Sequence, residues 1–349
     1  MNISQDELRK AATSSGISSD QADLLWQALQ TNPNLAEKPK FDVANVAYYL
    51  GALIVIGAMG WFMNKAWESF GGGGLLAVAS CYAVCFVLCG RTLWQQKLQI
   101  PSGLLITMAV CMIPLAVYGL ERWTGFWPAS DPGQYVNFHP YINGSWLLME
   151  VATVLGGIIA LRFWRFPFLT APIAYALWYM SMDLVDLLGN HQGMGWEEKQ
   201  VVSTVFGGVM MLVFYLIDLR GKSDDYAFWG YLFGLMAFWG GLSSMNSDSE
   251  LGKFVYCLIN IGLIFCSLVL RRRTFIIFGS LGLFGYLGHL AYTVFADSIL
   301  FPFALSLLGI GIIYLGVQYQ RRRKVLEQRF RKIVLPHMRG LIPARALAE

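Results

Sequence analysis

The residues best suited to chemistry in this sequence are four ionisable side chains that fall in long apolar runs: Glu150, Asp183, Asp186 and His289. A charge inside hydrocarbon costs about 2.5–3.5 kcal/mol at a helix centre, so each is a candidate for function. Asp183 and Asp186 are three residues apart and therefore share one helix face. Carboxylates and an imidazole at one depth could relay protons, act as a general acid and base, or bind a divalent cation.

These acids also have an explanation that needs no reaction. Acids within two turns of a helix end can reach water, and Glu150 can hydrogen-bond to a neighbour, which reduces the cost of burial. No His-x-x-x-His or Glu-x-x-His spacing occurs in the chain, so we predict no metal site. Nothing in the sequence predicts a cofactor or a nucleic-acid partner.

The elements that must position these residues are membrane helices. The chain is 56% hydrophobic and only 14% charged, with a mean hydropathy of +0.50, whereas a soluble domain carries roughly 25% charged residues. Apolar runs of about 20 residues, the length that crosses roughly 30 Å of hydrocarbon, recur from Ala44 onward. We predict an all-α, polytopic transmembrane helical bundle of about ten spans, near residues 44–63, 74–94, 100–120, 143–163, 166–188, 199–219, 226–246, 251–270, 274–296 and 299–319.

Charge placement predicts the orientation of this bundle. Of the 26 lysine and arginine residues, the outer segments hold only Lys65, Arg122, Lys199 and Lys253 when the N-terminus is placed inside. Cationic residues concentrate on the cytoplasmic side of membrane proteins. We therefore predict a multi-pass protein of the bacterial cytoplasmic (inner) membrane with both termini in the cytoplasm.

In this orientation the scarce acids and histidines gather toward the outer side. Glu150 lies roughly 10 Å deep by helical rise, and His289 falls in the outer third of its span. His139 and His191 belong to outer loops. A site built from these groups is expected to open outward.

Three regions are expected. Residues 1–43 are polar and acidic, lack a signal-peptide pattern and form a short helical cytoplasmic cap with capping boxes at Ser4 and Ser18. Residues 44–319 form the transmembrane domain. Residues 320–349 form a basic amphipathic tail expected to lie along anionic inner-leaflet lipids.

Glycines in two spans predict close helix packing. The ninth span contains Gly279, Gly282, Gly285 and Gly288, and the seventh contains a Gly-x-x-x-Gly pair that begins at Gly230. Small residues let two backbones approach, which matters in lipid because no hydrophobic drive brings helices together.

The N-terminal region resembles a known bacterial family. The carriers of the resemblance are the run GISSDQA at 16–22, a proline-bearing linker, the run YLGALIVIG at 49–57 and the closing NKAW at 64–67. Together they are similar to the start of the family called domain of unknown function 2157, over roughly the first 90 residues. The resemblance implies a multi-pass bacterial inner-membrane protein and brings no established activity or site residues.

The sequence leaves three functions open. The first is a transporter or a membrane assembly and scaffold component with a polar cavity open to the outside. The second is a membrane enzyme acting on a lipid-linked or envelope substrate, with Asp183, Asp186 or Glu150 as base and a histidine as partner. The third is an anchor whose cap and tail dock a membrane or cytoplasmic protein partner.

Overall fold

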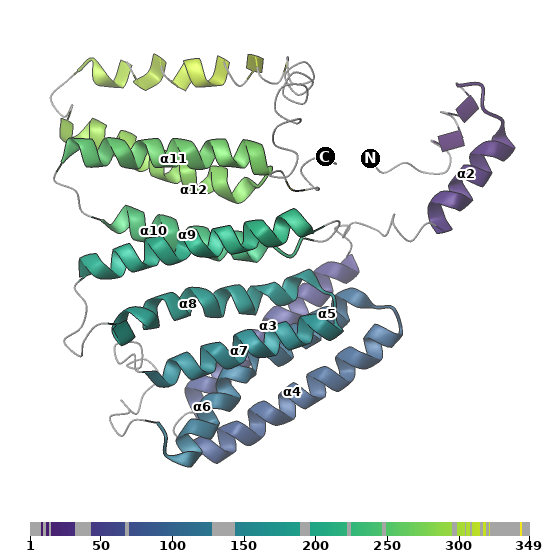
Figure 1. Cartoon of the computed structure of the whole chain (residues 1–349). Helices are drawn as coiled ribbons and strands as arrows, with labels where there is room; N and C mark the ends of the chain where they lie inside the picture. The colour runs from purple at the N-terminus through teal and green to yellow at the C-terminus, as the bar shows by residue number, and fades with distance from the viewer. Residues whose placement is uncertain are drawn as a thin grey trace. The chain divides into compact units, whose positions relative to one another are not determined.

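The structure, a computed structural model, is all-helical where it is described (Figure 1). It describes residues 8–9, 12–13, 15–31, 43–66, 70–127, 144–188, 196–221, 225–245 and 249–294, with shorter pieces at 299–303, 305–307, 309–314, 317–318, 321 and 343. No strand occurs among these residues. The predicted all-α fold is confirmed to this extent.

The described residues form the following helices and helical turns. In chain order they are α2 (Ser19–Thr31), α3 (Val43–Ala66), α4 (Gly71–Gln95), α5 (Gln99–Cys111), α6 (Ile113–Thr124), α7 (Gly144–Phe163), η3 (Pro167–Leu169), α8 (Thr170–Leu188), α9 (Trp196–Arg220), α10 (Phe228–Ser244), α11 (Glu250–Leu270), α12 (Arg273–His289) and η4 (Leu290–Val294). The element η3 is a 3-10 turn and η4 is a π-helical turn.

Within the described ranges, six helical segments are long and apolar enough to cross a membrane. They are Gly71–Gln95, Gln99–Thr124, Trp146–Phe163, Glu197–Arg220, Glu250–Ser267 and Arg273–Thr293. These six support a multi-pass membrane protein. Helices α3, α8 and α10 also overlap predicted spans, but the count of about ten stays a prediction.

Proline divides the predicted third span. Helix α5 ends at Cys111, and α6 begins at Ile113 with Pro114 in its first turn. Proline has no amide hydrogen and its ring clashes with the preceding turn, so a helix is interrupted just before it. The predicted third span is therefore built from two helices that meet next to Pro114.

The chain divides into two compact units, of which the first is Met1–Ile54. Its helix α2 begins with the predicted capping box: Gln21 N–H donates to Ser18 Oγ at 3.3 Å, and Ser18 N–H donates to Gln21 Oε1 at 3.4 Å. Arg9 donates two hydrogen bonds to the carboxylate of Asp23, from Nε at 2.8 Å and from Nη2 at 2.7 Å. The box predicted at Ser4 lies outside the described residues.

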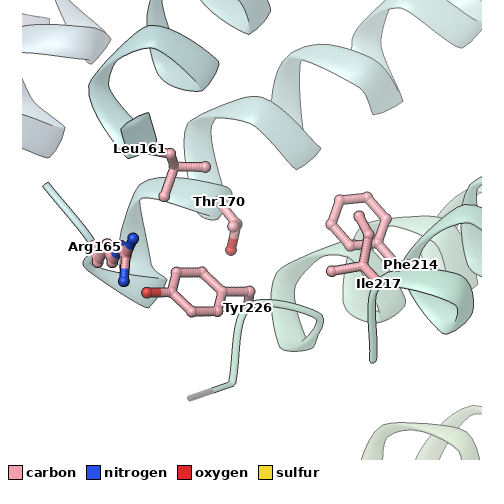
Figure 2. Close-up of a pocket in the computed structure, with 6 residues that line it drawn as sticks. All are labelled: Leu161, Arg165, Thr170, Phe214, Ile217 and Tyr226. Carbon is pink, nitrogen blue, oxygen red and sulfur yellow. The ribbon is translucent and has the colours of Figure 1, made fainter. Parts of the chain in front are cut away.

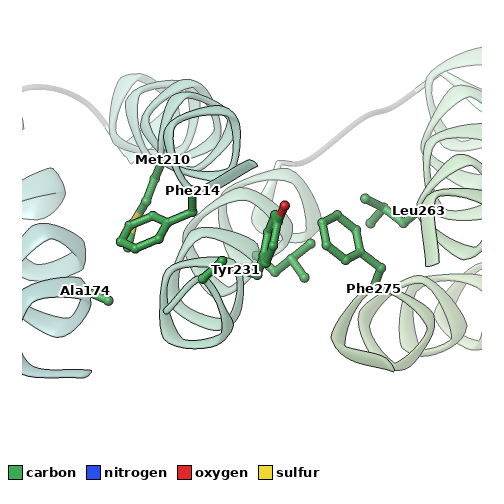
Figure 3. Packing of buried hydrophobic residues seen from close by; sticks show 8 residues of the cluster. Ala174, Met210, Phe214, Tyr231, Leu263 and Phe275 are labelled. Atoms are coloured by element: carbon green, nitrogen blue, oxygen red, sulfur yellow. The ribbon is translucent and has the colours of Figure 1, made fainter. Parts of the chain in front are cut away.

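The second unit, Val55–Glu349, contains α4 to α12. Helix α9 packs along α10, α11 along α12, and α4 along α5 and α6, while α10 also contacts α8 and α12. Figure 3 shows the largest apolar cluster, which joins α8 to α12 and includes Phe214, Tyr231 and Phe275. Many large apolar side chains stay exposed, for example Leu88 and Phe284, as expected for surfaces that face lipid.

Close packing at glycine is confirmed between α9 and α10. A Cβ added at Gly241 would lie 2.5 Å from Thr204 Oγ1 and 2.6 Å from the carbonyl oxygen of Gln200. One at Gly230 would enter the ring of Phe214. The two backbones therefore approach as closely as glycine permits.

Between α11 and α12, two of the four glycines for which close packing is predicted lie against the neighbouring helix. A Cβ on Gly279 would lie 2.7 Å from the carbonyl oxygen of Asn260, and one on Gly282 would collide with the Asn260 side chain. At Gly285 and Gly288 an added Cβ would meet nothing within 4 Å. Among the described residues, close packing is therefore seen at Gly279 and Gly282 and not at Gly285 and Gly288.

Candidate functional site

In the described part of the second unit, three ionised side chains and one tyrosine lie together in a group named here the ion cluster: Asp218, Asp225, Arg272 and Tyr231. Asp218 lies in the last turn of α9, Asp225 lies between α9 and α10, and Tyr231 lies in the first turns of α10. Arg272 is the residue that precedes α12. The ion cluster therefore joins the ends of three helices, and we call this the Arg272 end.

Arg272 uses its whole guanidinium group in the ion cluster. Nη2 donates to Asp218 Oδ1 at 2.6 Å and Nε to Asp218 Oδ2 at 3.3 Å. Nη1 donates to both carboxylate oxygens of Asp225 at 2.6 Å. Such charge-assisted, forked hydrogen bonds are about twice as strong as neutral ones and fix geometry as well as charge.

Tyr231 closes the apolar side of the ion cluster. Its side chain is almost fully buried, and its hydroxyl donates to Asp218 Oδ2 at a long 3.4 Å. The guanidinium carbon of Arg272 lies 5.4 Å from the centre of the Tyr231 ring, a cation–π contact. The other neighbour of that ring is Phe275, at 5.3 Å between centroids. One tyrosine thus separates the charges from the apolar core.

The turn between α11 and α12 presents Arg272 to its partners. Arg271 ends α11 in the left-handed conformation, with φ of 52°, which costs a non-glycine residue about 1 kcal/mol. Arg272 then takes an extended conformation with φ of −109° and ψ of 111°. This reversal directs its side chain back toward the end of α9.

Helix dipoles do not explain the ion cluster. The C-terminal end of α9 carries partial negative charge and disfavours Asp218, while the N-terminal end of α12 carries partial positive charge and disfavours Arg272. The attraction between the side chains must offset both effects. Burial by itself lowers the pKa of Arg272, but its hydrogen bonds and charge pairing with Asp225 and Asp218 raise that pKa above the ordinary value. The guanidinium therefore stays charged.

Sequence reasoning missed the ion cluster. The sequence does not single out Asp218, and Arg272 is one of 22 lysine and arginine residues that the charge distribution places on the cytoplasmic side. The available signal was an acid in the last turn of an apolar helix followed seven residues later by Asp225. Nothing in the spacing says that an arginine beyond the whole of α11 completes it.

At the opposite end of the helices, the His289 end, the structure brings one predicted residue together with an acid that was not predicted. His289 Nε2 lies 3.2 and 3.3 Å from the carboxylate oxygens of Glu250, the first residue of α11. Lys253 Nζ donates to the same carboxylate at 2.8 Å. The Glu250 side chain is 60% exposed. His289 is followed by the π-helical turn η4, a conformation that often marks functional sites.

The structure describes only one of the other predicted site side chains. Glu150 is buried on α7, 6% exposed, beside Met149 of the apolar cluster that includes Tyr118. It therefore does not simply reach water. The side chains of Asp183 and Asp186, and the whole of His139 and His191, lie outside the described residues.

Another acid that the sequence did not single out is Glu121, in the last turn of α6. Its side chain is 3% exposed, and neither carboxylate oxygen has a hydrogen-bond partner among the described residues. Helix α6 packs against α7, which carries Glu150. Two neighbouring helices thus each carry one buried acid.

A pocket of about 350 Å³ lies near the ion cluster at the Arg272 end, because two of its lining residues, Ile217 and Tyr226, adjoin Asp218 and Asp225 in the sequence. Figure 2 shows the side chains around this pocket. Its lining comes from the end of α7, the start of α8, the last turns of α9 and the residue before Ala227: Leu161, Arg165, Thr170, Phe214, Ile217 and Tyr226. Across the described residues, no three or more His, Cys, Asp or Glu side chains are grouped to hold a metal ion.

Comparison of the chain with protein-family models, with curated proteins and with solved structures found no match.

Proposed function

We propose that this chain is a non-enzymatic multi-pass protein of the bacterial inner membrane, a transporter or a membrane assembly component, whose ion cluster closes the cytoplasmic ends of α9, α10 and α12. The observation that carries the proposal is the burial of Arg272 between two aspartates. Buried ion pairs seldom add stability over apolar packing, so the presence of one here supports a role beyond stability.

A transporter needs one end sealed while the other admits its cargo. Separated charges regain hydration, which offsets the attraction they lose, so an ion cluster can open and close between states of similar free energy. Apolar packing has no such compensation. In the proposed arrangement the ion cluster seals the inside, and the polar cavity that holds Glu150, Asp183 and Asp186 opens to the outside.

The closure is tested by the accessibility of a buried position beside the ion cluster. Ala227 is 1% exposed and precedes α10. We expect Ala227→Cys, in a background without the six native cysteines, to react slowly with a membrane-impermeant maleimide in inverted vesicles. Adding Arg272→Gln should raise the labelling rate at least several-fold, whereas adding Arg273→Gln at the exposed next residue should not. Equal rates in both variants would remove the closing role.

The transport version is tested by proton flux into proteoliposomes that contain a pH-sensitive dye and carry an imposed membrane potential. We expect the combined Glu150→Gln, Asp183→Asn and Asp186→Asn chain to lose the flux that the unmodified chain shows. Unchanged proton flux would exclude the transport role. The assembly role would then remain, and it predicts a membrane partner that co-purifies with the full chain.

We propose about ten spans with both termini in the cytoplasm, and the distribution of lysine and arginine supports this orientation. Reporter fusions at Arg271, Arg165 and the C-terminus should all report a cytoplasmic position, and one at Lys253 an outer position. An outer position at Arg271 would overturn both the span count and the proposed closure.

One observation favours the enzyme as a second function: an acid and an imidazole lie within hydrogen-bond distance at Glu250 and His289. Such a pair could move a proton in a reaction on a lipid-linked or envelope substrate at the outer face. Here we expect His289→Gln and Glu250→Gln each to cause the same change in the envelope lipid profile of cells. A profile unaltered by either substitution would exclude this pair as the acid and base.

Membership in the family called domain of unknown function 2157 is likewise a proposal, supported by the runs at 16–22 and 49–57. The tail at 320–349 is proposed to bind anionic lipids, and the cap at 1–43 to dock a cytoplasmic partner. Deleting residues 1–40 without any loss of phenotype would remove the docking role.

A further inference from the structure

We propose that the pocket at the Arg272 end is a binding site for one anionic phospholipid of the cytoplasmic leaflet, with the headgroup phosphate at Arg165 and an acyl chain on the apolar wall. This inference does not depend on transport or catalysis. It concerns a specific lipid site on the helical bundle, separate from the basic tail.

The lining has the two characters that a phospholipid requires. Leu161, Phe214 and Ile217 make an apolar wall, while Arg165 supplies a cation and Tyr226 a hydroxyl. In Figure 2 the hydroxyl of Tyr226 points toward the side on which Arg165 lies. A guanidinium suits phosphate because its planar fork donates two parallel hydrogen bonds.

Arg165 is available for an anion. Its side chain is exposed, and within the part of the chain that the structure describes it has no ion-pair partner. The hydroxyl of Thr170 is already used, because it donates to the carbonyl oxygen of Pro167 at 2.8 Å. The charge that faces an incoming headgroup is therefore that of Arg165.

The ion cluster keeps negative charge out of the pocket. Two lining residues have an acid as their neighbour in the sequence: Asp218 follows Ile217, and Asp225 precedes Tyr226. Both carboxylates are turned to Arg272. The lining thus holds one cation and no carboxylate, which complements an anionic headgroup.

The pocket also lies where a headgroup would be. Arg165 follows the end of α7, next to Trp164 and the exposed ring of Phe163, and aromatic side chains of this kind mark the membrane–water boundary. The predicted orientation puts this end at the cytoplasmic leaflet, whose surface is anionic.

The test measures lipid retention by the full chain, delipidated in detergent and then mixed with phosphatidylglycerol or phosphatidylcholine of identical acyl chains, by native mass spectrometry. We expect one phosphatidylglycerol to be retained in preference to phosphatidylcholine. Arg165→Gln should lower that retention about fivefold, Arg165→Lys less, and Tyr226→Phe about twofold. The matched control is Arg162→Gln, an exposed cation one turn earlier that does not line the pocket.

Three results would overturn the proposal. Equal loss in Arg162→Gln and Arg165→Gln would mean diffuse attraction to the surface rather than a site. Equal retention of the two lipids would mean no anion recognition. Displacement of phosphatidylglycerol by millimolar inorganic phosphate would mean a site for free anions, with no contribution from the acyl chain.

Discussion

The two ends of the helices in the second unit use different means to hold together. At the Arg272 end the ion cluster links three helices, and its Arg272–Asp218 pair is buried, at 9% and 8% side-chain exposure, whereas Asp225 is 27% exposed. At the His289 end the charged contact between His289 and Glu250 is open to water. There α9 and α10 meet instead through Gly241, and Gln200 Nε2 donates to the carbonyl oxygen of Ser244 at 2.6 Å.

This difference has a physical consequence. A buried charge that loses its partner is not hydrated, so the Arg272 end depends on the pairing of Arg272 with Asp218. An exposed pair exchanges its partner for water at little cost. Four substitutions, from the largest expected effect to the smallest, test this contrast.

The largest effect is expected at Arg272. Arg272→Met leaves Asp218 and Asp225 without their cation, which should lower the free energy of unfolding by about 3–5 kcal/mol. SDS titration of the full chain in mixed micelles measures this change. The control is Arg273→Met at the exposed neighbour, for which little change is expected. A similar decrease in the free energy of unfolding in both variants would mean that the ion cluster does not stabilise this end of the helices.

The next effect tests backbone packing at the His289 end. Gly241→Val forces a side chain against Thr204 and Gln200 and should destabilise the chain by about 1–3 kcal/mol in the same titration. Gly240→Val is the matched control, because a Cβ at Gly240 would meet nothing within 4 Å. If both valines are equally harmful, helix propensity rather than close approach is responsible.

A smaller effect is expected at Tyr231. Tyr231→Phe removes the long hydrogen bond to Asp218 but keeps the ring over Arg272, so about 0.5–1.5 kcal/mol should be lost. Tyr231→Leu removes the ring as well and should lose more. Should the two variants be equally stable, the cation–π contact contributes nothing.

The smallest effect is expected at the exposed pair. Glu250→Gln should leave the unfolding of the chain unchanged within error, because water replaces the carboxylate at both His289 and Lys253. Lys253→Gln serves as the comparison. A loss that approaches the one at Arg272 would contradict the contrast between the two ends.

Individual residues show which features of the structure can be predicted from the sequence. Pro114 predicts a helix boundary because proline lacks an amide hydrogen, and Ser18 with Gln21 predicts a capping box, since both effects act within one turn. The sequence singles out His289 but not its acid partner. Glu250 is 39 residues away, and no local spacing relates the two.

The sequence by itself determined the apolar helices, their approximate ends and the predicted orientation, because hydropathy and lysine and arginine placement are properties of each segment. The tertiary structure alone decided which charges become buried. Arg271, Arg272 and Arg273 are three identical side chains in a row, yet only Arg272 lies between Asp218 and Asp225. That choice depends on how α9, α10 and α12 pack and on the left-handed turn at Arg271, which no spacing in the chain reveals.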